Sequence, residues 1–153
     1  MCDSMALAGA DCFLVVTPFF YKNAMTPKVL IDHFNEVADF APKPVIIYNV
    51  PANTGLGKFF CYNNSRTFST WKGTLNHVLI LDMSAEAIAE LADHPNICGV
   101  KDSGGDIAKI GQILHLTNNK NFQVLAGSAS FLFSSIALGA SGGVCALANV
   151  RIT

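Results

Sequence analysis

The sequence predicts an α/β fold built around a parallel β-sheet. Short apolar runs of strand length alternate with longer segments in which apolar residues recur at helical spacing, and this alternation is typical of β/α units. The short runs are apolar at nearly every position, as in strands that are buried on both faces. Two successive predicted strand ends, Thr17 and Tyr48, lie about 30 residues apart, which suits one β/α unit.

The predicted elements alternate along the chain. Strands are expected at 12–17, 45–48, 97–101, 122–126 and 142–147. The intervening helices should begin at capping residues, because a side-chain oxygen before the first turn accepts a free backbone N–H. These caps are Thr26, which precedes Pro27 in the first turn, then Ser84, Asp106, and Ser128 or Ser130. Segment 57–81 follows no helical period, although 77–81 could pair as an extra strand.

Length and composition limit the architecture. The 153 residues fit one domain, and a content of 51% hydrophobic against 14% charged residues requires extensive burial. Five parallel strands can form either an open doubly wound sheet or part of a (β/α)8 barrel. A complete barrel typically needs about 250 residues, so the length of this chain excludes one.

Charge and residue usage exclude several functions. The net charge of −1 leaves no basic surplus for nucleic acid, and no apolar run approaches the about 20 residues that span a bilayer. The five cysteines are widely spaced, which favours reduced core residues in an intracellular protein. The sequence shows no signal or transit peptide, so the residues alone favour a cytoplasmic location.

The candidate chemistry lies at the carboxyl ends of the strands, where both parallel architectures place their active sites. Lys101 ends the run 97–101 and is the unusual residue there. Burial disfavours the charged ammonium, and a neutral amine can form an imine with a carbonyl substrate. The alternative is a lysine that pairs with Asp102 or Asp106, and spacing alone leaves both open.

Other strand ends supply possible partners for this lysine. Tyr48 could exchange protons with a substrate oxygen, or it could be an ordinary core tyrosine. Ser103, with the backbone N–H groups around it, could hold a carboxylate or oxyanion, and so could donors at Gly127; both segments could also be plain capping loops. No metal site is predicted, because His33 and Glu36 have no third ligand near them.

Several linked motifs resemble one known family. They are TPFFY at 17–21, YNVPANTGL at 48–56, HPNICGVKDSGGD at 94–106 and FQVLAGSAS at 122–130. Together they resemble the dihydrodipicolinate synthase and N-acetylneuraminate lyase family, whose members are Schiff-base aldolases on a (β/α)8 barrel. The resemblance covers nearly all of the chain outside 57–81 and the two ends.

The resemblance implies specific roles for residues that match the family motifs. Lys101 would form the Schiff base and Tyr48 would shuttle protons, while Ser103 and Gly127 would contact the substrate. No metal or organic cofactor is implied.

The resemblance also bears on the substrate. Within the family, the motifs are most similar to the branch that cleaves 4-hydroxy-2-oxoglutarate to pyruvate and glyoxylate. Asn53 stands where dihydrodipicolinate synthases carry an arginine for a substrate carboxylate, which favours this small 2-oxo acid over a synthase-like reaction. Tyr21 resembles an aromatic residue that reaches the site of a neighbouring subunit, and the family implies a homotetramer in mitochondria.

The resemblance further predicts a partial barrel. Residues 1–153 would form a single incomplete domain that contains strands four to eight, with a non-family insertion at 57–81. Codons for Gly57-Lys58 and for Val150-Arg151 can contain a splice-donor sequence, so we interpret 57–81 and the last three residues as translated intron. The loop that grips the pyruvyl carboxylate in the family is not in this sequence, so we expect weak pyruvate binding by the chain alone. The rival hypothesis is a truncated product without catalytic activity.

Overall fold

The described part of the chain forms one parallel sheet. The computed structural model describes residues 1–21, 24–51 and 82–150. Its five strands pair in sequence order, and every pair is parallel: β1 (Phe13–Val16), β2 (Val45–Asn49), β3 (Ile97–Asp102), β4 (Gln123–Ala126) and β5 (Gly142–Gly143). This arrangement confirms the predicted α/β fold with a parallel sheet.

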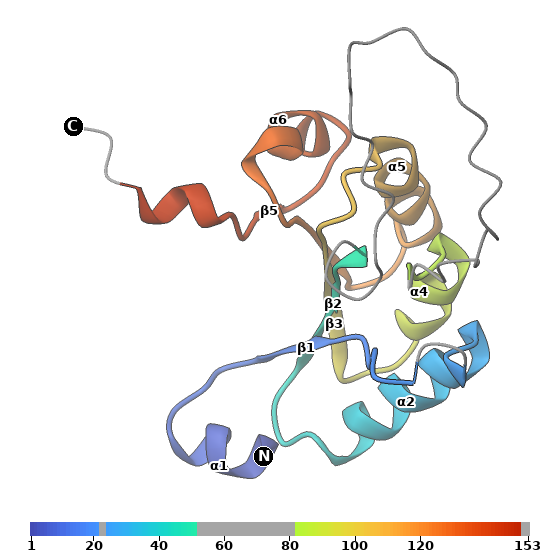
Figure 1. The fold of residues 1–153 in the computed structure, drawn as a ribbon, viewed down its shortest axis with the longest axis vertical. Helices are drawn as coiled ribbons and strands as arrows, with labels where there is room; N and C mark the ends of the chain where they lie inside the picture. The colour runs from blue at the N-terminus through green and yellow to red at the C-terminus, as the bar shows by residue number, and fades with distance from the viewer. Residues whose placement is uncertain (22–23, 52–81, 151–153) are drawn as a thin grey trace, which may run out of the picture.

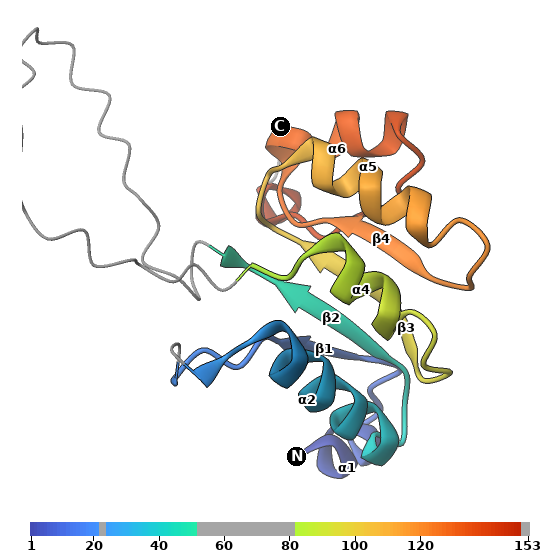
Figure 2. The same cartoon turned by 90° about the vertical axis from the view of Figure 1, so that its right-hand side faces the viewer.

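Helices connect the strands and lie mainly on one side of the sheet. They are α1 (Cys2–Leu7), α2 (Pro27–Phe40), α4 (Ala85–Leu91), α5 (Ile107–Leu116), α6 (Ala129–Ala137) and the 3-10 helix η2 (Ala146–Asn149). Figure 1 shows the sheet on edge with α2, α4 and α5 along one side of it, and Figure 2 shows these three helices in front of the strands. Among the described residues, no helix is both long and apolar enough to cross a membrane.

The predicted caps begin the helices of the structure. The hydroxyl of Thr26 accepts the N–H of Val29, and Pro27 occupies the first turn of α2. In the same way Ser84 caps α4 and Asp106 caps α5 through side-chain oxygens. For α6 the structure decides between the two predicted serines in favour of Ser128, whose hydroxyl accepts the N–H of Ser130.

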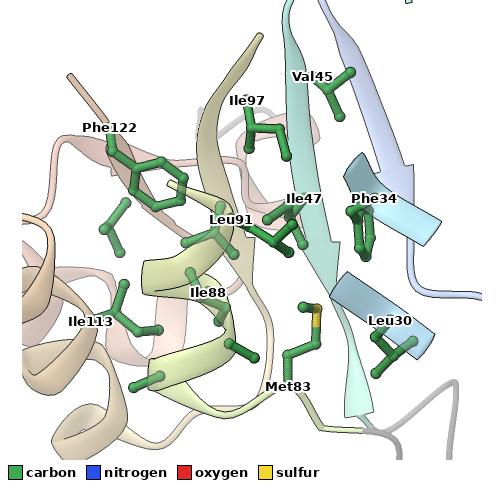
Figure 3. Close-up of a cluster of buried hydrophobic side chains, with 14 of the residues drawn as sticks. Leu30, Phe34, Val45, Ile47, Met83, Ile88, Leu91, Ile97, Ile113 and Phe122 are labelled. Atoms are coloured by element: carbon green, nitrogen blue, oxygen red, sulfur yellow. The ribbon is translucent and has the colours of Figure 1, made fainter. Parts of the chain in front are cut away.

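The hydrophobic core lies between the sheet and its helices, as Figure 3 shows. Phe34 of α2, Ile47 of β2, Ile88 and Leu91 of α4 and Ile113 of α5 are fully buried there. Burial of each such side chain stabilises a fold by about 1.5–3 kcal/mol relative to exposure. The core therefore fixes one face of the sheet against α2, α4 and α5.

The opposite face of the sheet is more open. Successive residues of a strand point to opposite faces, and in β1 the alternate residues Leu14 and Val16 are exposed while Phe13 is buried. Tyr48 of β2 lies beside Val16 of β1 and beside Lys101 of β3 in the register of the sheet. Residues side by side in neighbouring strands point to the same face, so Tyr48 and Lys101 share this open face with Val16. In the predicted barrel it is the face that lines the interior.

The last predicted strand is wrong beyond its first two residues. The prediction was a strand over 142–147, whereas β5 comprises only Gly142–Gly143 and residues from Ala146 form η2. The reason is pairing: β5 pairs with Leu125 and Ala126, and β4 ends at Ala126. The possible extra strand at 77–81 lies outside the described residues.

Candidate active site

Two neighbouring strand ends form the candidate site. In the register of the sheet Tyr48 lies beside Lys101, and Asn49 lies beside Asp102. Because side chains alternate along a strand, Tyr48 and Lys101 lie on the open face, whereas Asn49 and Asp102 lie on the helix face. Asn49 and Asp102 are fully buried, in agreement with this assignment.

Lys101 is buried although it lies on the open face. Only 8% of its surface is exposed, and its Nζ atom lies 4.0 Å from the centre of the Tyr48 ring. The alternative prediction that Lys101 pairs with Asp102 or Asp106 is wrong. Asp102 pairs with Lys109 instead, and Asp106 accepts the N–H of Lys109 as the cap of α5. Within the part of the chain that the structure describes, the salt bridges leave Lys101 without a carboxylate partner.

A buried hydroxyl follows this lysine by two residues in the chain. Ser103 follows β3, and among the described residues its Oγ atom is buried without a hydrogen-bond partner. It occupies the space beside Gly127, because a Cβ atom built on Gly127 would lie 1.8 Å from Ser103 Oγ. A buried polar atom without a partner is costly, so this hydroxyl is suited to bind a ligand oxygen.

Three of the backbone N–H groups that are candidates for further donors are already occupied. The N–H of Ser103 donates to the carbonyl of Asn49 at 2.8 Å, and that of Gly127 donates to the carbonyl of Asp102 at 2.7 Å. The N–H of Gly104 donates to Asp102 Oδ1 at 2.8 Å. Continuation of the sheet and an Asx-type turn use these three groups, which favours the alternative of plain capping loops for them. Contact of Ser103 and Gly127 with the substrate stays a prediction.

The remaining predicted residues lie apart from this cluster or outside the described residues. Tyr21 is 70% exposed, and its ring packs edge-to-face on Phe20 with 5.0 Å between the ring centres. An exposed aromatic side chain agrees with the predicted reach toward a neighbouring subunit, which stays a prediction. Asn53 lies outside the described residues.

Sequence reasoning missed a polar cluster behind the strand ends. It joins Asn49, Asp82, Asp102 and Lys109 through hydrogen bonds and ion pairs. A signal was present, because Asn49 and Asp102 each follow a candidate catalytic residue at the end of an apolar run. Their partners come from distant segments, and no local pattern identified Lys109.

Comparison with known proteins covers most of the chain. The model of the dihydrodipicolinate synthetase family matches residues 1–57 and 79–152. A 4-hydroxy-tetrahydrodipicolinate synthase of Methanothrix thermoacetophila is 31% identical over 94% of this chain and 39% of its own length. A protein of Emericella nidulans, named as a probable mitochondrial 4-hydroxy-2-oxoglutarate aldolase, is 32% identical over 98% of this chain and 40% of its own length.

The fold has close counterparts among solved structures. A chloride-inhibited dihydrodipicolinate synthase from Acinetobacter baumannii, complexed with pyruvate, superposes with a TM-score of 0.74 at 26% identity. The match covers 97% of this chain and 42% of that one. The five-stranded sheet therefore corresponds to part of the barrel of these enzymes, and the chain spans about two fifths of the relatives it matches. Because the family model matches most of its residues, this chain belongs to the dihydrodipicolinate synthetase family.

Proposed function

We propose that Lys101 forms a Schiff base with a 2-oxo acid in a class I aldolase or lyase reaction. The observation that carries the proposal is the burial of Lys101 at the end of β3, with its amine over the Tyr48 ring and without a carboxylate partner among the described residues. The amine of a lysine in this position can attack the carbonyl carbon of a bound 2-oxo acid. The unpartnered Ser103 hydroxyl supplies a donor for the bound acid.

The preferred reaction is cleavage of 4-hydroxy-2-oxoglutarate. The Lys101 amine attacks the C2 ketone, and loss of water gives a protonated imine that acts as an electron sink. Tyr48 accepts the proton of the C4 hydroxyl, directly or by relay, and the C3–C4 bond breaks to release glyoxylate. The electrons of that bond remain as an enamine, which is protonated at C3 and hydrolysed to pyruvate and free Lys101. The residues named supply general acid–base and nucleophilic catalysis.

A synthase-like reaction is the second candidate. The Methanothrix relative is named a 4-hydroxy-tetrahydrodipicolinate synthase, and such a reaction would condense enzyme-bound pyruvate with an aldehyde. The name of the Emericella relative and the asparagine at position 53 favour cleavage instead.

The two reactions are separated by direct assay. The chain, alone and completed with the rest of the Emericella relative, is incubated with 4-hydroxy-2-oxoglutarate or with pyruvate and aspartate semialdehyde. We expect glyoxylate release from the completed protein and little condensation. Condensation that exceeds cleavage would favour the synthase, and a completed protein that does neither, while it still unfolds cooperatively, would support the rival hypothesis of an inactive product.

Tyr48→Phe tests the proton shuttle. The phenyl ring keeps the surface on which the Lys101 amine lies, so the variant removes only the hydroxyl. General acid–base groups typically contribute about 10²–10⁴-fold to rate, and we expect kcat for glyoxylate release to fall in that range with less change in KM. Steady-state kinetics of the completed protein measure both constants. Unchanged kcat would move the shuttle to another residue, with Tyr21 the next candidate.

We also propose a mitochondrial location and a homotetrameric assembly. The name of the Emericella relative supports the location, and the exposed Tyr21 supports an assembly in which its ring meets a neighbouring subunit. Fractionation of cells that express the full-length gene tests the location, and light scattering of the purified product tests the assembly.

Residues 57–81 are proposed to be an insertion of translated intron. The two matched segments of the family model leave 58–78 outside, in support of this interpretation. Genomic DNA without a splice donor at Gly57-Lys58 would exclude it.

A further inference from the structure

A partly buried ionic cluster lies directly behind the proposed Schiff-base lysine. It is built by Asn49 at the end of β2, Asp102 at the end of β3, Lys109 in α5 and Asp82, which precedes α4. Asp102 has an exposed fraction of 0%. Burial of a charge is costly unless it is paired and hydrogen-bonded, so the partners of this carboxylate are a structural requirement.

Three donors satisfy the Asp102 carboxylate. Its Oδ2 atom accepts from Asn49 Nδ2 at 2.6 Å and from Lys109 Nζ at 2.8 Å. Its Oδ1 atom accepts the N–H of Gly104 at 2.8 Å. One carboxylate therefore connects the ends of two strands, the helix α5 and the loop that follows β3.

This loop carries the unpartnered hydroxyl of the candidate site. Ser103 lies between Asp102, which belongs to the cluster, and Gly104, whose N–H donates to the Asp102 carboxylate. The loop lies close to the cluster, because a Cβ atom built on Gly104 would lie 3.1 Å from Asp102 Oδ1 and 3.7 Å from Lys109 Nζ. Lys101, Asp102 and Ser103 are consecutive residues. The backbone that Asp102 holds in place therefore also determines the positions of the Lys101 amine and the Ser103 hydroxyl.

Lys109 is the cation of the cluster. Its side chain is 10% exposed and forms ion pairs with both Asp102 and Asp82. Burial acts to lower the pKa of Lys109, but hydrogen bonds and charge from Asp102 and Asp82 raise it above its usual value. The ammonium therefore remains charged through the neutral range, and the pair would be lost only in strongly alkaline solution.

We propose that Lys109 is a positioning residue, which holds Asp102 and the loop 103–104 so that the Lys101 amine and the Ser103 hydroxyl face the same bound 2-oxo acid. The amine and the hydroxyl lie on the side of the sheet where substrate would bind, and Lys109 lies on the helix face. It therefore acts through Asp102 and does not touch the substrate. The expected effect of Lys109 on adduct formation rests on the proposed Schiff-base function. The expected effect of Lys109 on the order of loop 103–104 does not.

The test compares Lys109→Met with Lys109→Arg and with a matched control. Methionine keeps most of the length and removes the charge, whereas arginine keeps the charge and can pair with both carboxylates. The control is Lys120→Met, because Lys120 is also partly buried and paired, with Asp93 at 2.7 Å and the Ala89 carbonyl at 2.6 Å, but outside the site.

Two readouts are measured on the full 153-residue chain. The first is amide hydrogen exchange at Ser103 and Gly104. The second is the rate at which borohydride fixes a pyruvyl adduct on Lys101, followed against pyruvate concentration to separate affinity from maximal rate. For Lys109→Met we expect at least tenfold faster exchange at Gly104 and a maximal trapping rate about 10- to 100-fold lower, since a displacement of about 1 Å can cost 100-fold. Lys109→Arg should remain within a few-fold of the unchanged chain, and Lys120→Met should match it.

Each outcome decides a separate question. Wild-type exchange at Gly104 in Lys109→Met would overturn the inference, as would equal losses in Lys109→Met and Lys120→Met. If no adduct forms on Lys101 in the chain or in the chain completed with the rest of the Emericella relative, the Schiff-base proposal fails, and the exchange measurement still decides whether Lys109 holds the loop. If Lys109→Met does not fold, Lys109→Gln takes its place, because it removes the ion pair with Asp102 and keeps a polar side chain. Wild-type exchange at Gly104 in that variant would then overturn the inference.

Discussion

Lys101→Arg will abolish the covalent adduct with pyruvate. Borohydride reduces a pyruvyl imine to a stable carboxyethyl-lysine, and we expect this product at Lys101 in the unchanged chain and at no position in the variant. The physical reason is the guanidinium group, which stays protonated and has no free amine to attack a carbonyl. Arginine has a similar length and can also lie over the Tyr48 ring, so the variant removes the amine with little change in packing.

Peptide mapping by mass spectrometry measures the adduct, and trapping is more informative than turnover. Reduction is irreversible, so adduct accumulates even if pyruvate binds weakly to the chain alone. Lys120→Arg is the matched control, since Lys120 is partly buried and ion-paired but lies outside the site. An adduct at Lys120, or one that persists in Lys101→Arg, would reject Lys101 as the nucleophile.

Most of the described fold could be predicted from local signals. Thr26, Ser84 and Asp106 were identified as caps, and each accepts a backbone N–H in the structure. The first four strands lie within a residue or two of the predicted runs. Short apolar runs that are bounded by turn-forming residues are typical of buried strands, so their positions could be predicted from sequence. The fifth strand was overextended, since its length depends on how far β4 continues beside it.

The candidate site could be predicted only in part. Lys101 and Tyr48 were identified from their positions at strand ends, and the parallel register brings them side by side. The partners of Asp102 could not be identified, because Asn49 lies 53 residues away and pairs with it only through the register of β2 and β3. The role of the backbone donors beside Ser103 stayed open because sequence does not show which N–H groups the sheet already uses.

Gly127→Ala should disrupt the site through a steric effect. A Cβ atom at position 127 would lie 1.8 Å from Ser103 Oγ, 2.9 Å from Ser103 Cβ and 2.9 Å from the Asp102 carbonyl oxygen. The serine hydroxyl can rotate, but the Asp102 carbonyl is held by its hydrogen bond from the Gly127 N–H at 2.7 Å. The ends of β3 and β4 must therefore separate. We expect the free energy of unfolding to fall by about 1–3 kcal/mol, which is typical of overpacking, and adduct formation at Lys101 to fall with it.

A second glycine provides a control of opposite sign. Gly111 lies within α5, where a Cβ atom would make an ordinary contact of 3.6 Å with Leu138, so Gly111→Ala should stabilise the chain by about 0.5–1 kcal/mol. Urea unfolding of both variants measures the two effects. The double variant Ser103→Ala/Gly127→Ala removes the contact with the hydroxyl and keeps the contact with the Asp102 carbonyl, so it should recover only part of the lost stability. Full recovery would place the whole loss of stability in the contact with the hydroxyl. A Gly127→Ala variant as stable as Gly111→Ala would show that the strand ends tolerate a side chain at position 127. Close packing of Gly127 on Ser103 would then not define the site.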